Sequence, residues 1–311
     1  MKSQILVTAS KLSTTHDGWT SRAFDAWIKP ELTAISCHEG DLKKPKATTT
    51  PQQRTMPALN FDGAYGNSYR TSIRDSVPGY DVLHEIALAT VHSISSRAKS
   101  ALVVGPGPGE QLPDLLKACP NAEITVLEPS EQMLSFCREA ISRDPGRERC
   151  VLIQGELNHE RVQTLNRNSW DLVVCHNVLH LFEAKKQVQL LRLLAQCTGR
   201  NGLLLLSGYS EPTDPSTMER MMEIGLQRLR DRDLSEQQVV AIRNTRNKVV
   251  FSVDSARVST VLTSEELTPS LQLNQGLFAR HCASSREGEG FTTAPAFQSV
   301  YGKKKVFSLL I

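Results

Sequence analysis

The chain has 311 residues, of which 40% are hydrophobic, so it is long and apolar enough to fold around one large core or two smaller ones. Its 36 basic and 33 acidic residues leave a formal net charge of +3, a balance that argues against nucleic acid as a partner. Seven cysteines without a Cys-x-x-Cys pair, and the lack of any apolar run of about 18 residues, predict a cytoplasmic protein with reduced thiols, no metal site and no membrane partner.

The two ends of the chain are predicted to lie outside the main domain. Residues 40–57 are rich in Lys, Thr, Pro and Gln and have no apolar periodicity, which is typical of a linker. The pattern changes at Phe61. We therefore predict an N-terminal extension and linker over 1–60, a main domain over 61–284 and a C-terminal tail over 285–311.

Within the main domain, short apolar runs alternate with amphipathic segments. Strands that are apolar on both faces and are separated by amphipathic helices indicate a parallel sheet covered by helices on either side. We therefore predict an α/β, Rossmann-like fold with a mostly parallel, seven-stranded sheet. The predicted helices cover 82–95, 110–119, 130–142 and 184–198, and the predicted strands cover 101–105, 123–129, 150–156, 170–182 (running into a turn) and 201–209.

The alternation is interrupted over about 212–250. This segment reads as one or two amphipathic helices, with Met, Ile and Leu recurring at helical spacing. An insertion of this kind predicts a helical lid over the sheet. After it, residues 257–273 and 276–284 are predicted to return to the sheet as its last strands.

A glycine-rich turn, "LVVGPGPGEQ" over 102–111, follows the first predicted strand. Glycines at such a turn let a ligand touch main-chain atoms, because a Cβ would occupy the ligand's space. A phosphate-binding P-loop would need Lys and Ser/Thr after the glycines, and neither is present. A dinucleotide fingerprint would need a third glycine where Glu110 stands, and this carboxylate would repel a pyrophosphate. A cationic cofactor without phosphates avoids that conflict.

Acidic residues end the next two predicted strands. Glu128 stands at the end of the second strand, and Gly155 and Glu156 stand at the end of the third. The carboxyl ends of parallel strands share one edge of the sheet, so these residues are expected beside the glycine turn. The combination predicts an S-adenosylmethionine site, with an acid for the ribose hydroxyls and a polar residue for the adenine.

At these motifs the sequence resembles the class I S-adenosylmethionine-dependent methyltransferases. The resemblance rests on "VVGPGPGEQ", "VLEPS", "QGEL" and "DLVVCHNVLHLF". With "FD" at 61–62 and "SVPGY" at 76–80, the chain more closely resembles the carboxy-S-adenosylmethionine synthases of the tRNA wobble-uridine pathway and their methyltransferase relatives. The likeness extends over roughly 61–284, and Val103 and Gly107 depart from the pattern of the synthases.

The resemblance implies roles for individual residues. Tyr80 would close over the amino-acid end of the cofactor, Glu128 would bind the ribose, and Arg243 would hold the extra carboxylate of a carboxylated cofactor. The remaining cofactor contacts that the resemblance implies are Gly105, Pro106, Gly107, Gly109, Pro129, Gly155, Glu156, Leu157, His176 and Asn177.

Methyl transfer needs positioning of the reactants and, for a weak nucleophile, a base. His176 and His180 follow the fourth predicted strand and are the candidate bases, although His180 also has the spacing of a packed core residue. Tyr69 and Arg243 are candidate substrate contacts, and Arg243 could equally be a solvated arginine.

Three functions remain open from the sequence. A lid and a balanced charge favour a methyltransferase acting on a small molecule. The alternatives are a carboxy-S-adenosylmethionine synthase in tRNA modification and a non-catalytic S-adenosylmethionine-binding protein. The sequence also leaves a homodimer open.

Overall fold

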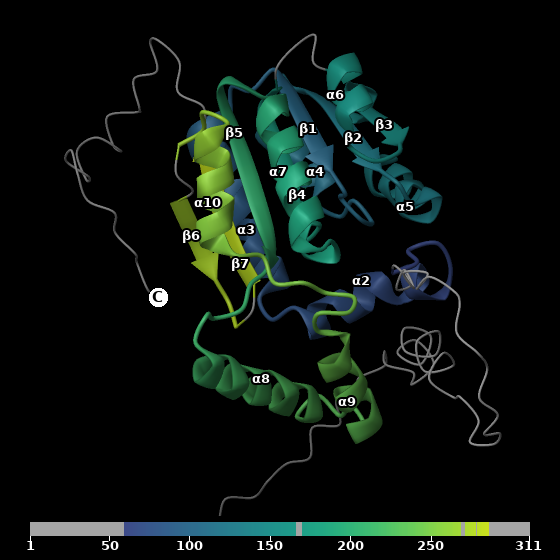
Figure 1. Ribbon diagram of the computed structural model, residues 1–311. Coiled ribbons are helices and arrows are strands. Elements are labelled where there is room, and N and C mark those ends of the chain that lie inside the picture. Colours follow the sequence, from purple (N-terminus) through teal and green to yellow (C-terminus); the bar gives the residue numbers. More distant parts are fainter. Residues whose placement is uncertain (1–58, 166–169, 269–270, 278, 286–311) are drawn as a thin grey trace, which may run out of the picture.

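The computed structural model describes residues 59–165, 170–268, 271–277 and 279–285, and a seven-stranded sheet forms its centre (Figure 1). The strand order is β3-β2-β1-β4-β5-β7-β6, and β7 runs antiparallel to both of its neighbours while the other neighbouring pairs are parallel. This confirms the predicted mostly parallel, Rossmann-like sheet. The strands are β1 Ser100–Val104, β2 Glu123–Glu128, β3 Cys150–Gln154, β4 Trp170–His176, β5 Thr198–Tyr209, β6 Leu271–Gln275 and β7 Ala279–Ser285.

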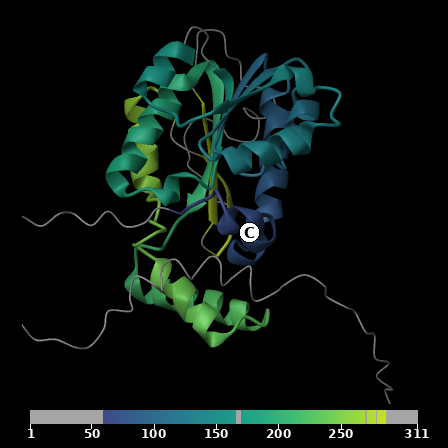
Figure 2. The same cartoon turned by 90° about the vertical axis from the view of Figure 1, so that its right-hand side faces the viewer.

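Helices cover both faces of the sheet (Figure 2). The central strands are apolar on both sides, as the fully buried run from Ala101 to Val103 in β1 illustrates, so each face needs a helical layer. Side chains of α3, α4 and α5 form one core with one face, and those of α6, α7 and α10 form a second core with the other. These helices are α3 Tyr80–Thr90, α4 Leu112–Ala118, α5 Glu131–Ile141, α6 His159–Leu165, α7 Ala184–Cys197 and α10 Ser255–Ser264.

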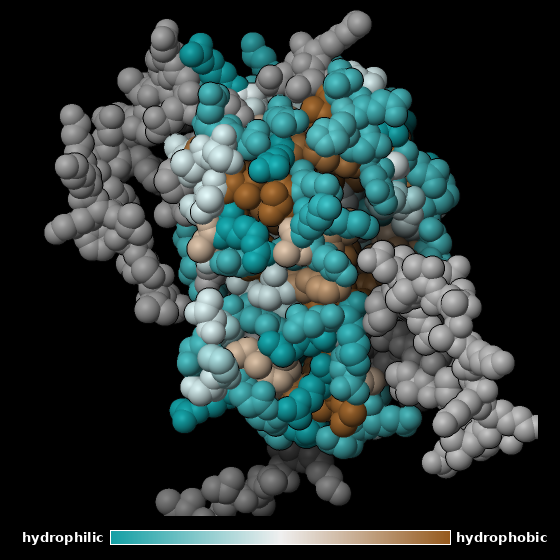
Figure 3. Space-filling view, in the orientation of Figure 1, coloured by the Kyte–Doolittle hydropathy of each residue, from teal (hydrophilic) through white to brown (hydrophobic). Residues whose placement is uncertain are grey.

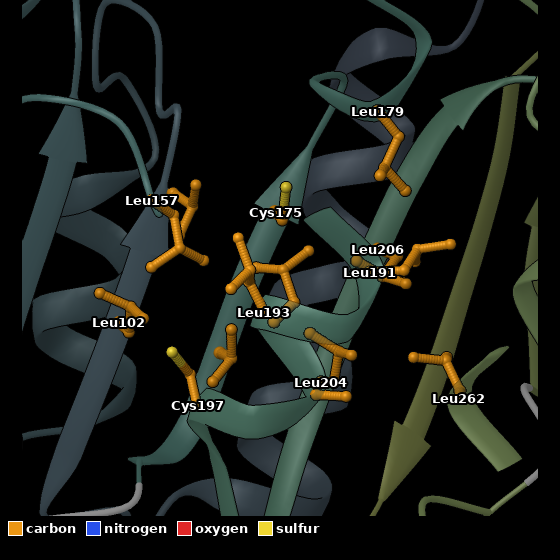
Figure 4. Close-up of a cluster of buried hydrophobic side chains, with 14 of the residues drawn as sticks. Leu102, Leu157, Cys175, Leu179, Leu191, Leu193, Cys197, Leu204, Leu206 and Leu262 are labelled. Carbon is orange, nitrogen blue, oxygen red and sulfur yellow. The ribbon is translucent and has the colours of Figure 1, made fainter. Parts of the chain in front are cut away.

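The second core is dense with leucine (Figure 4). Leu204 of β5 is fully buried there among Leu191 of α7 and Leu262 of α10. Leu204→Ala is expected to lower the free energy of unfolding by about 2–5 kcal/mol, because it removes buried methyl groups and leaves a cavity. Urea unfolding followed by circular dichroism measures this. Val82→Ala, at a position 47% exposed on α3, is the control and should change stability by no more than about 0.5 kcal/mol; equal effects at the two positions would contradict this packing.

Three helices lie beyond the edge of the sheet at which the parallel strands end (Figure 1). They are α2 Ala64–Ser76, α8 Pro215–Arg230 and α9 Glu236–Thr245. The last two pack on each other through a small core of their own, and Asp214 and Ser235 cap their N-termini. This α8–α9 pair occupies the segment for which a lid is predicted.

Two local predictions differ from the structure. Residues 257–264 belong to α10 and not to a strand, because Asp254 caps this helix and its buried residues Val258, Val261 and Leu262 recur at helical spacing. Helix α2 was not predicted; it buries small and polar residues such as Ser68 and Asp75, although Tyr65, Tyr69 and Ile73 recur on it at helical spacing. The other predicted helices and strands between 82 and 209 lie within a few residues of those observed.

On the face shown in Figure 3, hydrophobic residues form separate patches among hydrophilic ones. The large apolar side chains that are exposed, such as Val151 on β3 and Ile224 on α8, lie on different elements. No helix in the described part of the chain is long and apolar enough to cross a membrane. The homodimer that the sequence leaves open stays open, and the predicted linker over 40–57 lies outside the described residues.

Candidate active site

The glycine turn follows β1, and its three glycines have distinct structural roles. Gly105, Gly107 and Gly109 all have left-handed φ angles, of 64°, 59° and 69°. A Cβ on Gly105 would lie 2.5 Å from the side chain of Val178, and one on Gly109 would lie 2.7 Å from Cys137 Sγ. At Gly107 nothing is nearer than a ring carbon of Tyr69, at 3.5 Å. Packing therefore requires glycine at 105 and 109, whereas Gly107 leaves space open.

That space is part of a cavity of about 430 Å³ at the carboxyl ends of β1, β2 and β4, which we call the glycine-turn cavity. Most residues that the sequence predicts as cofactor contacts line this cavity, because the ends of parallel strands meet at one edge. Gly109 is the exception among the predicted cofactor contacts, since it packs against α5 instead of lining the cavity. The predicted contacts that do line it are Tyr80, Gly105, Pro106, Gly107, Glu128, Pro129, Gly155, Glu156, Leu157, His176 and Asn177.

Glu128 is a buried carboxylate at the centre of this wall. Only 5% of the residue is exposed, and its two oxygens accept hydrogen bonds from the backbone N–H groups of Gly107 (3.2 Å) and Ser130 (3.0 Å). Burial raises the pKa of Glu128 to about 7, while these two hydrogen bonds act to lower it. The carboxylate has acceptor capacity left for hydroxyl groups of a ligand.

Glu110 does not act as the sequence argument assumed. Its carboxylate receives hydrogen bonds from two arginines of α2, Arg70 at 3.3 Å and Arg74 at 3.0 Å, and it does not line the glycine-turn cavity. The negative charge that was expected to repel a pyrophosphate is therefore compensated. The choice between cofactors rests instead on Glu128 and on the comparisons below.

An aromatic group that the sequence analysis missed lies beside the glycine turn. The ring of His84 packs edge-to-face against Tyr80, with centroids 4.6 Å apart, and against His176, at 5.6 Å. Burial lowers the pKa of His84 to about 4, so its ring is neutral near pH 7. Its position four residues after Tyr80 on a predicted helix was the available signal. Other polar lining residues that were missed are Gln111, Asn158, His159, Lys186 and Gln189.

A second cavity, of about 200 Å³, lies between α2, the turn after β4, the end of β5 and the α8–α9 pair; we call it the α2–α8 cavity. Most of its wall is apolar. Four residues line both cavities, and they mark where the two meet: Phe61, Tyr69, Asn177 and Leu181. Tyr69, predicted as a substrate contact, therefore stands between the two spaces.

Asn177 lies at this junction and has an unusual backbone conformation. Its φ of 58° lies in the left-handed region, which asparagine tolerates better than most residues. Its N–H donates to both the carbonyl oxygen (3.0 Å) and the Oγ (3.1 Å) of Ser207 at the end of β5. This bonding places Asn177 between the cavities.

The structure separates the two candidate bases. His176 lines the glycine-turn cavity, and its Nδ1 lies 3.1 Å from Ser207 Oγ. His180 lines the α2–α8 cavity, and its Nδ1 accepts the N–H of Tyr209 (3.3 Å). Burial lowers the pKa of His180 to about 4, so the neutral ring carries its proton on Nε2. In this arrangement His180 is a hydrogen-bond donor and not a general base.

Arg243, the predicted carboxylate contact, does not line either cavity. Its guanidinium pairs with two glutamates of α8, Glu219 at 2.7 Å and Glu223 at 3.5 Å. Two other arginines of this region, Arg228 and Arg246, line the α2–α8 cavity instead. Arg243 therefore serves the contact between α8 and α9.

The residues of the glycine-turn cavity fit S-adenosylmethionine. A Cβ at Gly107 would enter the space beside the turn, which suits close approach of a ligand to the backbone. Glu128 offers a buried acceptor for ribose hydroxyls, and the segment around Leu157 offers an apolar wall for a base. The cavity volume is that of a small-molecule site.

Residues 102–204 match the model of a family described as a methyltransferase domain. No curated protein matches the sequence. Among solved structures, the fold is similar to that of an O-methyltransferase family protein from Burkholderia thailandensis, with a TM-score of 0.53 and 15% identity over 73% of this chain and 61% of that one. The chain thus spans less than two thirds of the length of that protein.

Two further structures are similar. The magnesium protoporphyrin IX methyltransferase of Synechocystis PCC 6803, solved with bound SAH, has a TM-score of 0.54 and 15% identity over 73% of this chain and 96% of that one. The pyocyanin biosynthetic protein PhzM has a TM-score of 0.50 and 16% identity over 72% of this chain and 59% of that one. At these identities the structures establish a shared fold. The fold is thus the Rossmann-like one of these methyltransferases, and the family match covers residues 102–204.

Proposed function

We propose that this protein transfers a methyl group from S-adenosylmethionine to a small molecule held in the α2–α8 cavity. The observation that carries the proposal is the junction of the two cavities at Tyr69 and Asn177. One cavity has the walls of a cofactor site, and the other is a smaller, mostly apolar space that shares four lining residues with it. The similar structures include proteins named for small-molecule methylation, which supports the same assignment.

In this proposal the cofactor supplies an activated methyl group, and the chain supplies positions and a dry site. Glu128 holds the ribose hydroxyls, and the turn at Gly107 passes the amino-acid end. Tyr69 directs the acceptor towards the junction, while the apolar walls of the α2–α8 cavity exclude water. His176, hydrogen-bonded to Ser207, is the proton acceptor in the proposal. His180 orients the acceptor as a donor from Nε2.

The second candidate, a carboxy-S-adenosylmethionine synthase, rests on the resemblance at 61–62 and 76–80, which implies that Arg243 holds the extra carboxylate. With that guanidinium paired to Glu219 and Glu223, the residue offers no contact for an extra carboxylate. This position favours the ordinary cofactor. Mass spectrometry of the ligand that copurifies with the protein separates the two, because a carboxylated cofactor would support the synthase.

Filling the α2–α8 cavity tests the proposal. Ser72 of α2 lines that cavity and not the other one, so Ser72→Leu is expected to lower methyl transfer about 100-fold while leaving cofactor affinity unchanged. Transfer is measured with methyl-labelled S-adenosylmethionine and a panel of small phenols, carboxylic acids and amines, and affinity by calorimetry.

The matched control is Thr71→Leu, on the exposed side of the same helix, which should preserve both transfer and affinity. Unchanged transfer in Ser72→Leu would contradict the placement of the acceptor. Cofactor binding without label in any acceptor would support the non-catalytic alternative, and no affinity for S-adenosylmethionine would overturn the proposal.

A further inference from the structure

The α2–α8 cavity has an uneven charge. Among its described lining residues there are two arginines and no aspartate or glutamate. Arg246 is compensated, because both carboxylate oxygens of Glu211 receive its Nε and Nη2, the latter at 2.7 Å. The same carboxylate accepts the hydroxyl of Tyr209 at 2.5 Å. The charge of Arg246 is therefore already satisfied within the protein.

Arg228 has no such partner within the described part of the chain. Its guanidinium projects from α8 and donates to the backbone carbonyl oxygens of Asp75 and, at 3.3 Å, Arg74. The nearby carboxylate of Asp75 forms its ion pair with Arg232. Two arginines thus share one carboxylate, and a net positive charge is left at the wall of the cavity.

A guanidinium that shares its nearest carboxylate with a second arginine, beside apolar walls, is suited to bind an anion. Burial and the charge of Arg232 lower the pKa of Arg228, while the charge of Asp75 acts to raise it. The neighbouring lining residues Ile73, Leu226 and Leu229 are buried and apolar. The two carbonyl contacts use two of the five N–H donors of the side chain, and the planar fork that remains matches a carboxylate.

The position of Arg228 determines how long a ligand must be to reach from this arginine to the junction of the cavities. It contacts the carbonyls of Arg74 and Asp75, whereas the cavities meet at Tyr69 on the same helix. Five to six residues of α-helix separate these points, which is about 8 Å at 1.5 Å per residue. A molecule that reaches from Arg228 to the junction must span about this distance across apolar walls.

We propose that the acceptor molecule carries a carboxylate that binds Arg228, about 8 Å from the atom that faces the junction at Tyr69. The inference rests on the proposed function, because it names the class of molecule that the α2–α8 cavity takes. The acceptor is then a small apolar acid with its methyl-accepting group at the opposite end. Arg228 determines specificity and takes no part in the chemical step.

Matched acids and amides test the proposal. The probes are 4-hydroxybenzoate, 4-hydroxyphenylacetate, 3-(4-hydroxyphenyl)propanoate and 4-hydroxycinnamate, each paired with its primary amide of nearly equal shape. Calorimetry is run with and without S-adenosylhomocysteine. The wild-type protein is expected to bind at least one of the longer acids about tenfold or more tightly than its amide, as charge-assisted hydrogen bonds imply.

Variants of α8 assign that preference to one residue. In Arg228→Gln the ratio of acid to amide affinity is expected to fall to about one, and Arg228→Lys should retain part of it. Arg220→Gln, at an exposed arginine of the same helix, is the control and should keep the full ratio. Thermal unfolding and S-adenosylhomocysteine affinity verify that each variant folds.

The outcomes separate the two proposals. If no acid binds more tightly than its amide, or if the ratio survives in Arg228→Gln, the carboxylate site is overturned even where methyl transfer to neutral acceptors is observed. If acids bind through Arg228 and no acceptor is ever methylated, the carboxylate site stands and the proposed function fails.

Discussion

Gly107→Val is expected to abolish measurable binding of S-adenosylmethionine, with a loss of affinity of about 100-fold or more. A side chain at this position would enter the glycine-turn cavity beside Tyr69, and a β-branched residue would also strain the left-handed backbone by roughly 1–2 kcal/mol. Calorimetry with S-adenosylhomocysteine measures the affinity. Thermal unfolding of the free variant reports whether it folds.

A variant at a second glycine separates the effect of backbone strain from the effect of filling the cavity. Gly79 also has a left-handed φ, of 78°, but no atom lies within 4 Å of its would-be Cβ, and it lines neither cavity. Gly79→Val should therefore show a similar strain and retain cofactor affinity. Equal affinities for Gly107→Val and the wild type would mean that the cofactor does not pass this turn.

Glu128→Gln is expected to lower cofactor affinity about 10- to 100-fold, because hydroxyl groups of the ribose would lose a charged acceptor. The affinity of the wild-type protein should rise with pH through about 7, as the carboxyl group ionises. The variant should show a flat profile over the same range. Calorimetry between about pH 5.5 and pH 8.5, on either side of the pKa of about 7, compares the two proteins.

The carboxyl group of Glu128 should also make the stability of the free protein fall as the pH rises, the opposite of the trend in cofactor affinity. Burial raises the pKa of Glu128 from 4.5 to about 7, so the folded protein binds a proton that the unfolded chain releases. The stabilisation by this proton is complete below 4.5 and is lost as the pH rises through about 7. Relative to Glu128→Gln, the wild type should lose up to about 3 kcal/mol over this interval. If the free energy of unfolding changes with pH in the same way in both proteins, Glu128 is not a buried, protonated group.

Much of the glycine-turn cavity was predictable because its signals are local. The part of its wall that was predicted comes mainly from residues that directly follow a strand, and the carboxyl ends of parallel strands converge without any knowledge of packing. Thus Gly107, Glu128 and Leu157 were placed together from the sequence alone. Gly109 follows the same pattern, but its contact with Cys137 depends on how closely α5 approaches the turn.

The α2–α8 cavity was less predictable because its walls are far apart in sequence. Helix α2 was not predicted, so its arginines were not placed, and the pairing of Arg74 with Glu110 spans 36 residues. The spacing of Arg243 marked it as a candidate, yet only the packing of α8 on α9 decides which arginine faces the glutamates and which faces the cavity. The sequence alone therefore does not single out Arg228.

The backbone of Asn177 also limits how this protein can change over evolutionary time. Because the residue where the cavities meet has a φ of 58°, side chains branched at Cβ are disfavoured there, and glycine, asparagine and aspartate are the residues that accept this conformation readily. Few residue types fit at position 177, so we expect this residue to vary least among related proteins that differ in what they bind.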